Sequence, residues 1–109
     1  MPRAADSPVT AKDDTVILSR RFEELIPGFI ENRRKELEEL RGALGAGRYK
    51  QLGEIGHRMR GIGATYGFDR VSDLGGQIEE RAAASDRQGL AACLAEYEEY
   101  LARVKVVYE

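Results

Sequence analysis

Residues 48–67 read RYKQLGEIGHRMRGIGATYG, and the spacing of their apolar side chains indicates the fold. Apolar residues recur in this stretch every three or four positions, which is the period of an α-helix. At about 100° per residue they all lie on one side of the helix. These residues are Leu52, Ile55, Met59, Ile62 and Tyr66. The pattern predicts an amphipathic helix from Arg48 to about Tyr66 that ends at Gly67.

The same period continues on both sides of this stretch, where glycine and proline divide it into further helices. We predict a short helix at 16–26, main helices at 28–44, 48–66 and 69–84, and a last helix from 85 to about 108. Ser85 is the expected N-cap of the last helix, because Gln88 follows at the spacing of a capping box. No strand-like alternation occurs after Val16. The predicted fold is all-α, an antiparallel up-down four-helix bundle with a short extra N-terminal helix.

Length and composition limit the class of protein. A length of 109 residues corresponds to one domain. Residues 1–15 hold two prolines and few large apolar side chains, so we expect a flexible tail or linker there and the bundle in residues 16–109. With 17 Lys and Arg against 19 Asp and Glu, the net charge of −2 argues against binding nucleic acid through positive charge. A single Cys and a single His exclude a Cys–His metal cluster.

The expected location follows from what the sequence lacks. No apolar run approaches the roughly 20 residues that a membrane span needs, and the N-terminus has no signal-peptide core. Cys93 cannot form an internal disulfide, and its place near the apolar stripe of the last helix predicts a packed thiol. We therefore expect a soluble cytoplasmic domain that binds neither nucleic acid nor membrane.

His57 is predicted to lie on the side of the 48–66 helix opposite its apolar stripe, and therefore in solvent. The same helix contains four glycines, namely Gly53, Gly56, Gly61 and Gly63. Each costs roughly 0.5–1 kcal/mol relative to alanine in a helix interior. We therefore expect these glycines to clear the surface around His57 for the close approach of another protein or a bulky group.

An exposed imidazole surrounded by cations and glycines suits phosphoryl transfer. Neutral imidazole is nucleophilic near pH 7, and Arg or Lys stabilises the oxygens of a transferring phosphoryl group. We predict that His57 accepts a phosphoryl group, with charge stabilisation from Arg58 and Arg60 and steric access at Gly61. Glu79 lies at the edge of the next helix's apolar stripe, from where its carboxylate can reach the imidazole and fix its tautomer. The alternatives are a surface histidine without a role and an ordinary solvated glutamate.

The stretch from His57 to Phe68, HRMRGIGATYGF, resembles the signature of histidine-containing phosphotransfer (HPt) domains. That signature is a histidine followed by an apolar residue at +2, a basic residue at +3, glycine at +4, small residues, then glycine at +10 and an apolar residue at +11. Leu74 and Ile78-Glu79 resemble the following helix of the family. The resemblance covers roughly residues 19–107. One departure is Arg60, because the family more often has lysine at this position.

The resemblance implies that His57 accepts a phosphoryl group from a phospho-aspartate on a response-regulator receiver domain, or passes it to one. It also implies a basic residue near the phosphoryl oxygens at Arg60, an open site at Gly61, and a hydrogen bond between Glu79 and the imidazole. The expected partners are receiver domains and hybrid sensor histidine kinases. The chain would be a monomeric phosphocarrier rather than an enzyme, with no ATP-binding site and no cofactor, and with Mg²⁺ expected only on the receiver.

Two other functions fit a helical bundle of this size. One is a docking module that binds a receiver without accepting phosphate, and the presence of His57 with its flanking charges favours phosphotransfer over it. The other is the dimerisation domain of a histidine kinase, whose histidine is followed by an acidic residue and then a proline. Here Arg58 follows and no proline occurs after Pro27, which argues against that domain. The charged run at 33–39 is expected to be a solvated helix face.

Overall fold

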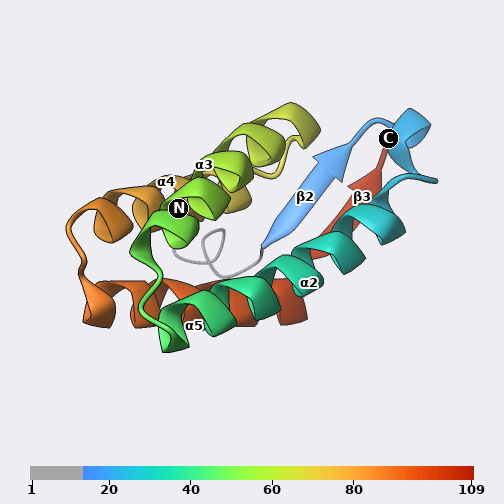
Figure 1. The fold of residues 1–109 in the computed structure, drawn as a ribbon. Coiled ribbons are helices and arrows are strands. Elements are labelled where there is room, and N and C mark those ends of the chain that lie inside the picture. The colour runs from blue at the N-terminus through green and yellow to red at the C-terminus, as the bar shows by residue number, and fades with distance from the viewer. Residues whose placement is uncertain (1–13) are drawn as a thin grey trace, which may run out of the picture.

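The computed structural model describes residues 14–109. Its elements in chain order are β2 (Thr15–Leu18), the 3₁₀ helix η1 (Arg20–Phe22), α2 (Ile26–Gly45), α3 (Tyr49–Tyr66), α4 (Asp69–Ala83), α5 (Arg87–Arg103) and β3 (Lys105–Tyr108). Successive helices run antiparallel, and α3 lies beside α4 along much of its length (Figure 1). The predicted up-down four-helix bundle is confirmed. The predicted tail falls mostly on residues 1–13, which lie outside the described residues.

The core is built from the apolar stripes of the four helices. In α3, Leu52, Ile55 and Met59 are buried as predicted, while Ile62 and Tyr66 are half-buried and pack against the core. The helix ends at Gly67, also as predicted. Gly67 has φ +83° and donates its N–H to the carbonyl of Gly63, a left-handed C-cap that glycine adopts without steric cost.

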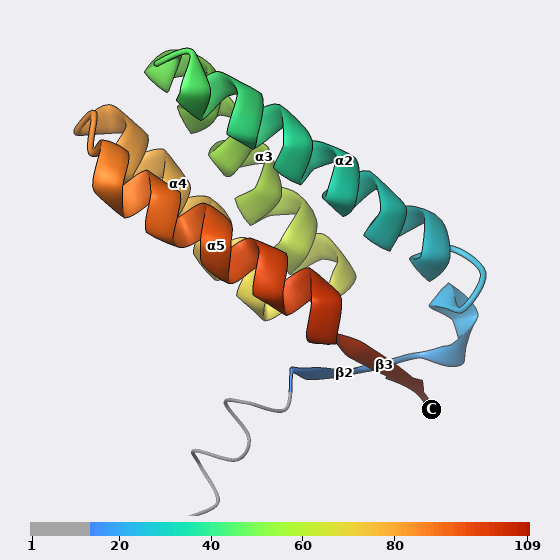
Figure 2. The same cartoon turned by 90° about the horizontal axis from the view of Figure 1, so that it is seen from below.

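A two-stranded parallel sheet lies at one end of the bundle (Figure 2). In this sheet β2 pairs with β3, and Leu18 is opposite Tyr108. The predicted helix at 16–26 is therefore wrong, because a strand and a single 3₁₀ turn precede α2. The predicted continuation of the last helix to Tyr108 is wrong as well, since α5 ends at Arg103. Both segments contain two β-branched Val or Ile residues, which favour strands, but each is only four residues long and its partner lies at the other end of the chain.

The N-cap of α5 is not the predicted one. Ser85 has φ +52°, and its neighbour Asp86 is the N-cap, with its carboxylate accepting the N–H of Gly89 at 2.9 Å. This hydrogen bond and the guanidinium of Arg81, 3.1 Å away, hold the pKa of Asp86 below its ordinary value. Ser and Asp are comparably good N-caps, so the sequence does not distinguish between them.

Part of the charged run of α2 is buried rather than solvated. The Nε of Arg33 lies 3.0 Å from Oε1 of Glu36, and both residues are buried. The hydroxyl of Tyr97, on α5, donates to the same oxygen at 3.1 Å. Burial raises the pKa of both Glu36 and Tyr97 above their ordinary values. The prediction of a solvated face is wrong for Arg33 and Glu36, because α5 packs over them.

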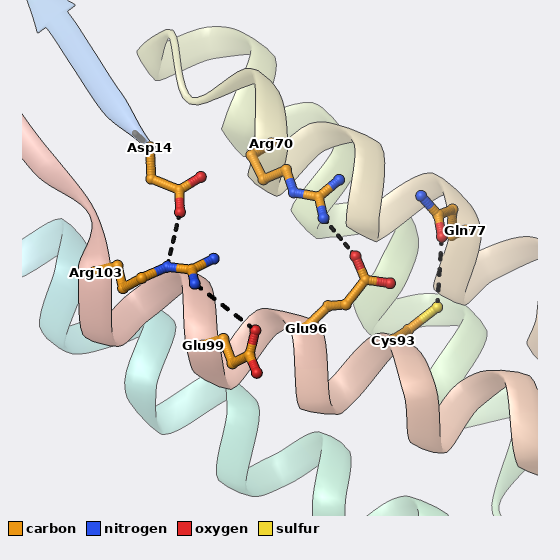
Figure 3. A network of polar contacts seen from close by, with 7 residues as sticks. All are labelled: Asp14, Arg70, Gln77, Cys93, Glu96, Glu99 and Arg103. Carbon is orange, nitrogen blue, oxygen red and sulfur yellow. Dashed lines mark hydrogen bonds and ion pairs between the residues drawn. The ribbon is translucent and has the colours of Figure 1, made fainter. Parts of the chain in front are cut away.

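Polar contacts hold α5 against α4 and against the residue that precedes β2 (Figure 3). The contacting pairs are Arg70–Glu96, Gln77–Cys93 and Arg103–Asp14, and Arg103 also pairs with Glu99 within α5. Cys93 is buried, as predicted, and burial raises the pKa of its thiol. In the part of the chain that the structure describes, no helix is long and apolar enough to cross a membrane.

Candidate functional site

His57 lies in the middle of α3 on the side turned away from the core, and its side chain is 72% exposed. Its ring Nδ1 is 3.0 Å from Oε2 of Glu79, which comes from α4. An ionised carboxylate can only accept hydrogen bonds, so in the neutral ring Nδ1–H is the donor. This contact therefore leaves the lone pair of His57 on Nε2.

The carboxylate of Glu79 also contacts Arg60. Its other oxygen, Oε1, lies 3.5 Å from Nη1 of Arg60 and is covered from solvent. One carboxylate from α4 thus holds an imidazole and a guanidinium that both come from α3. The hydroxyl of Ser72, also on α4, donates to the backbone carbonyl of Arg60 at 2.8 Å. The position of Arg60 is thereby linked to α4 through both its side chain and its backbone.

Arg58 extends away from this cluster toward α2. Its Nη2 lies 3.9 Å from Oε1 of Glu39, and both side chains are more than half exposed. An ion pair this exposed contributes little to stability, so Arg58 can leave it at small cost. Of the two predicted arginines, the structure brings Arg60 into contact with Glu79 and places Arg58 beside Glu39.

A groove of about 680 Å³ runs between α3 and α4 next to His57. The surface of the groove is mainly apolar, and Tyr49, Gly53 and Ala82 are among the residues that line it. Lys50 borders it as well, about two turns before His57. Exposed apolar surface next to a reactive polar group is typical of a surface that meets another protein.

The four glycines of α3 differ in their surroundings. A Cβ added at Gly61 would have no atom within 4 Å, and one at Gly53 would meet only the Cβ of Ala82 at 3.6 Å. Gly56 and Gly63 are instead buried against α4. The expectation that all four glycines clear the surface is wrong for these two, because α3 and α4 approach too closely there to admit a side chain.

Two residues next to the site were not assigned to it from the sequence. Glu39 belongs to the charged run of α2, and Ser72 belongs to a row of small residues on α4 that also includes Gly76. Their contacts with Arg58 and Arg60 depend on how neighbouring helices are placed along one another, which helical periodicity does not define. Within residues 14–109, no group of three or more His, Cys, Asp or Glu residues could hold a metal ion.

The family model of the Hpt domain matches residues 24–106, a range that includes all four helices and therefore both His57 and Glu79. No curated protein and no solved structure matches the chain. The chain belongs to the Hpt domain family, which confirms the resemblance found in the sequence. Hpt domains act in phosphorelays by histidine phosphotransfer. They are phosphocarrier modules rather than catalytic enzymes, and they interact with response-regulator receiver domains and kinase domains.

Proposed function

We propose that this Hpt domain carries the phosphoryl group on His57 and exchanges it with the aspartate of a receiver domain, whether in a response regulator or in a hybrid sensor histidine kinase. The observation that carries the proposal is the 3.0 Å contact between Nδ1 of His57 and Glu79 on an otherwise exposed ring. It supports a ring whose second nitrogen is available to a protein partner.

In the proposed transfer, the lone pair of Nε2 attacks the phosphorus of the receiver's aspartyl phosphate. The P–N bond forms as the P–O bond breaks, and the aspartate leaves as a carboxylate. Nδ1 of His57 keeps its proton throughout, so the phosphorylated ring carries a positive charge. The carboxylate of Glu79 stabilises that charge. The reverse transfer, from His57 to a receiver, uses the same groups in the opposite direction.

Arg60 and Arg58 supply positive charge for the phosphoryl oxygens in this proposal. A guanidinium has five N–H donors, so Arg60 can contact Glu79 and phosphoryl oxygens together. Arg58 exchanges its exposed contact with Glu39 for the same oxygens. The open space at Gly61 admits the partner's backbone within one helical turn of His57.

The proposed transfer needs no cofactor on this chain, because its attacking and charge-stabilising groups are all side chains. The divalent cation that we expect, Mg²⁺, belongs to the receiver. We further propose that the chain works as a monomer in the cytoplasm, with the groove beside His57 as part of the surface that meets the receiver.

The test is transfer from a purified receiver that has been phosphorylated with radiolabelled acetyl phosphate and freed of small molecules. We expect rapid transfer of label to the chain, as acid-labile and alkali-stable phosphohistidine, and no label on His57→Gln. Binding of the receiver without any label on the wild-type chain would contradict the proposal and favour the docking module. Label on the His57→Gln chain would contradict the assignment of the site.

A further inference from the structure

We infer that Gly56 and Gly75, at which the backbones of α3 and α4 approach too closely for a side chain, are positioning residues that set the distance between His57 and Glu79. The inference deepens the proposed function and rests on it for the effect on phosphoryl transfer. It also concerns the hydrogen bond of the imidazole, which can be observed without any transfer.

The contact between Gly56 and Gly75 leaves no room for a side chain on either helix. A Cβ at Gly56 would lie 2.7 Å from the carbonyl oxygen of Gly75 and 2.8 Å from the backbone N of Glu79. A Cβ at Gly75 would lie 2.5 Å from the backbone N of Arg60 and 2.6 Å from the carbonyl oxygen of Gly56. The obstructing atoms are backbone, so one added methyl group on either side has to move the helices apart.

Each of the two glycines lies within about one helical turn of the side chain that it would position. Gly56 directly precedes His57, and Gly75 lies one helical turn before Glu79. A hydrogen bond of 3.0 Å is near the middle of the normal range, and an increase of about 1 Å takes it out of that range. Separating the helices at this point therefore acts directly on the contact between Nδ1 and the carboxylate.

Two other glycines on the same helices, Gly53 and Gly76, are not required by close packing. A Cβ at Gly53, one turn before Gly56, would make an ordinary contact of 3.6 Å with Ala82. At Gly76, next to Gly75, it would lie 3.7 Å from Cδ of Arg60. Since alanine is the better helix former, Gly53→Ala and Gly76→Ala are matched controls that change helix propensity without separating the helices.

The experiment measures ¹⁵N NMR of the imidazole of His57, the only histidine in the chain, at a pH where the ring is neutral. In the wild type we expect mainly the tautomer with the proton on Nδ1. In Gly56→Ala and Gly75→Ala we expect a mixture of tautomers like that of Glu79→Ala, and phosphoryl acceptance slowed by about tenfold, as when an orienting partner is lost. Gly76→Ala should keep the wild-type spectrum and rate, and Gly53→Ala, which changes the lining of the groove, should keep the wild-type spectrum.

Wild-type spectra in folded Gly56→Ala and Gly75→Ala would overturn the inference. So would loss of the fold in both variants while the controls fold by circular dichroism, because the glycines would then serve the bundle rather than the contact. A wild-type chain that accepts no phosphoryl group would defeat the proposed function instead, and the tautomer comparison among the five variants would still decide the role of the glycines.

Discussion

Two glutamates of this bundle have similar partners in opposite surroundings. Glu36 accepts a hydrogen bond from the hydroxyl of Tyr97 and pairs with Arg33, whereas Glu79 contacts the ring of His57 and pairs with an arginine at the surface. The side chain of Glu36 is 6% exposed and that of Glu79 is 36% exposed. In the core, the cluster of Glu36, Arg33 and Tyr97 (the buried cluster) holds α2 and α5 together. At the surface, in the function that we propose, the cluster of Glu79, His57 and Arg60 (the exposed cluster) orients a nucleophile that a partner can reach.

The largest expected effect is on phosphoryl acceptance at the exposed cluster. His57→Gln should abolish labelling by a phosphorylated receiver, because the amide has no nucleophilic ring nitrogen. The free energy of unfolding in urea should stay within about 0.5 kcal/mol of wild type, as for most surface substitutions. A clear loss of stability would mean that the exposed cluster is structural, like the buried one.

The buried cluster should show the opposite result. Glu36→Ala leaves the guanidinium of Arg33 buried without its carboxylate, so we expect a loss of about 3–5 kcal/mol in the free energy of unfolding. Glu38→Ala, which removes an exposed carboxylate from the same helix, is the control and should change it by less than about 1 kcal/mol. If folded Glu36→Ala accepted phosphate at a reduced rate, the two clusters would not be independent.

Access to the exposed ring can be tested at Gly61. Gly61→Leu places a large side chain in open space one turn from His57, where it would displace a docking receiver, so transfer should slow by about a hundredfold. The helix itself should gain up to about 1 kcal/mol from the better helix former. Gly42→Leu on α2, where the space is also open, is the control and should transfer at the wild-type rate. Unchanged transfer by the Gly61 variant would contradict the proposed access.

Removing the orienting carboxylate should have a smaller effect. Glu79→Ala should slow phosphoryl acceptance by about tenfold, because the ring loses its tautomer preference and its partner for the positive charge. Glu79→Gln keeps an oxygen acceptor and should recover part of the rate. Glu80→Ala, at the exposed position next to it, should have no effect. Equal rates in all three variants would assign Glu79 to the solvated surface.

The smallest expected effect is a pH dependence of stability at the buried cluster. Burial raises the pKa of Glu36, so its contribution to stability is full below the ordinary pKa of a glutamate and is lost as pH rises through the folded-state pKa. We therefore expect wild type to lose stability relative to Glu36→Gln as the pH rises above the ordinary pKa of a glutamate, about 4.3. If urea unfolding gave the same difference in free energy between wild type and Glu36→Gln at every pH, the result would contradict the expected pKa shift.

The local pattern of apolar residues was sufficient to predict the four main helices and the outward direction of the His57 side chain. The stripe from Leu52 to Tyr66 and the stop at Gly67 define α3 without reference to any other part of the chain. The signature around His57 runs from the middle of this helix to Phe68, two residues past its end, so local sequence was enough to indicate the family. Glu79 required one further step, because its reach toward His57 depends on α4 being the antiparallel neighbour of α3.

The sequence pattern gave wrong predictions where contacts between distant segments of the chain decide the structure. The apolar residues within 16–18 and 105–108 fit the helical period, and only the pairing of these two segments with each other makes them strands. Arg33 and Glu36 lie in a run of charges that suggests solvent, and only the packing of α5 buries them. The small residues Gly56 and Gly63 suggested a cleared surface, although they serve close helix packing.

The sequence by itself determined four amphipathic helices, the end of α3 at Gly67 and an exposed imidazole flanked by arginines. All of these follow from the periodicity and conformational preference of neighbouring residues. Only the tertiary structure decided the distance between Glu79 and His57, which charges are buried and how closely α3 and α4 approach. The physical reason is that hydrogen-bond distance and burial depend on the relative position of separate helices, to within about 1 Å. Helix periodicity leaves that position open.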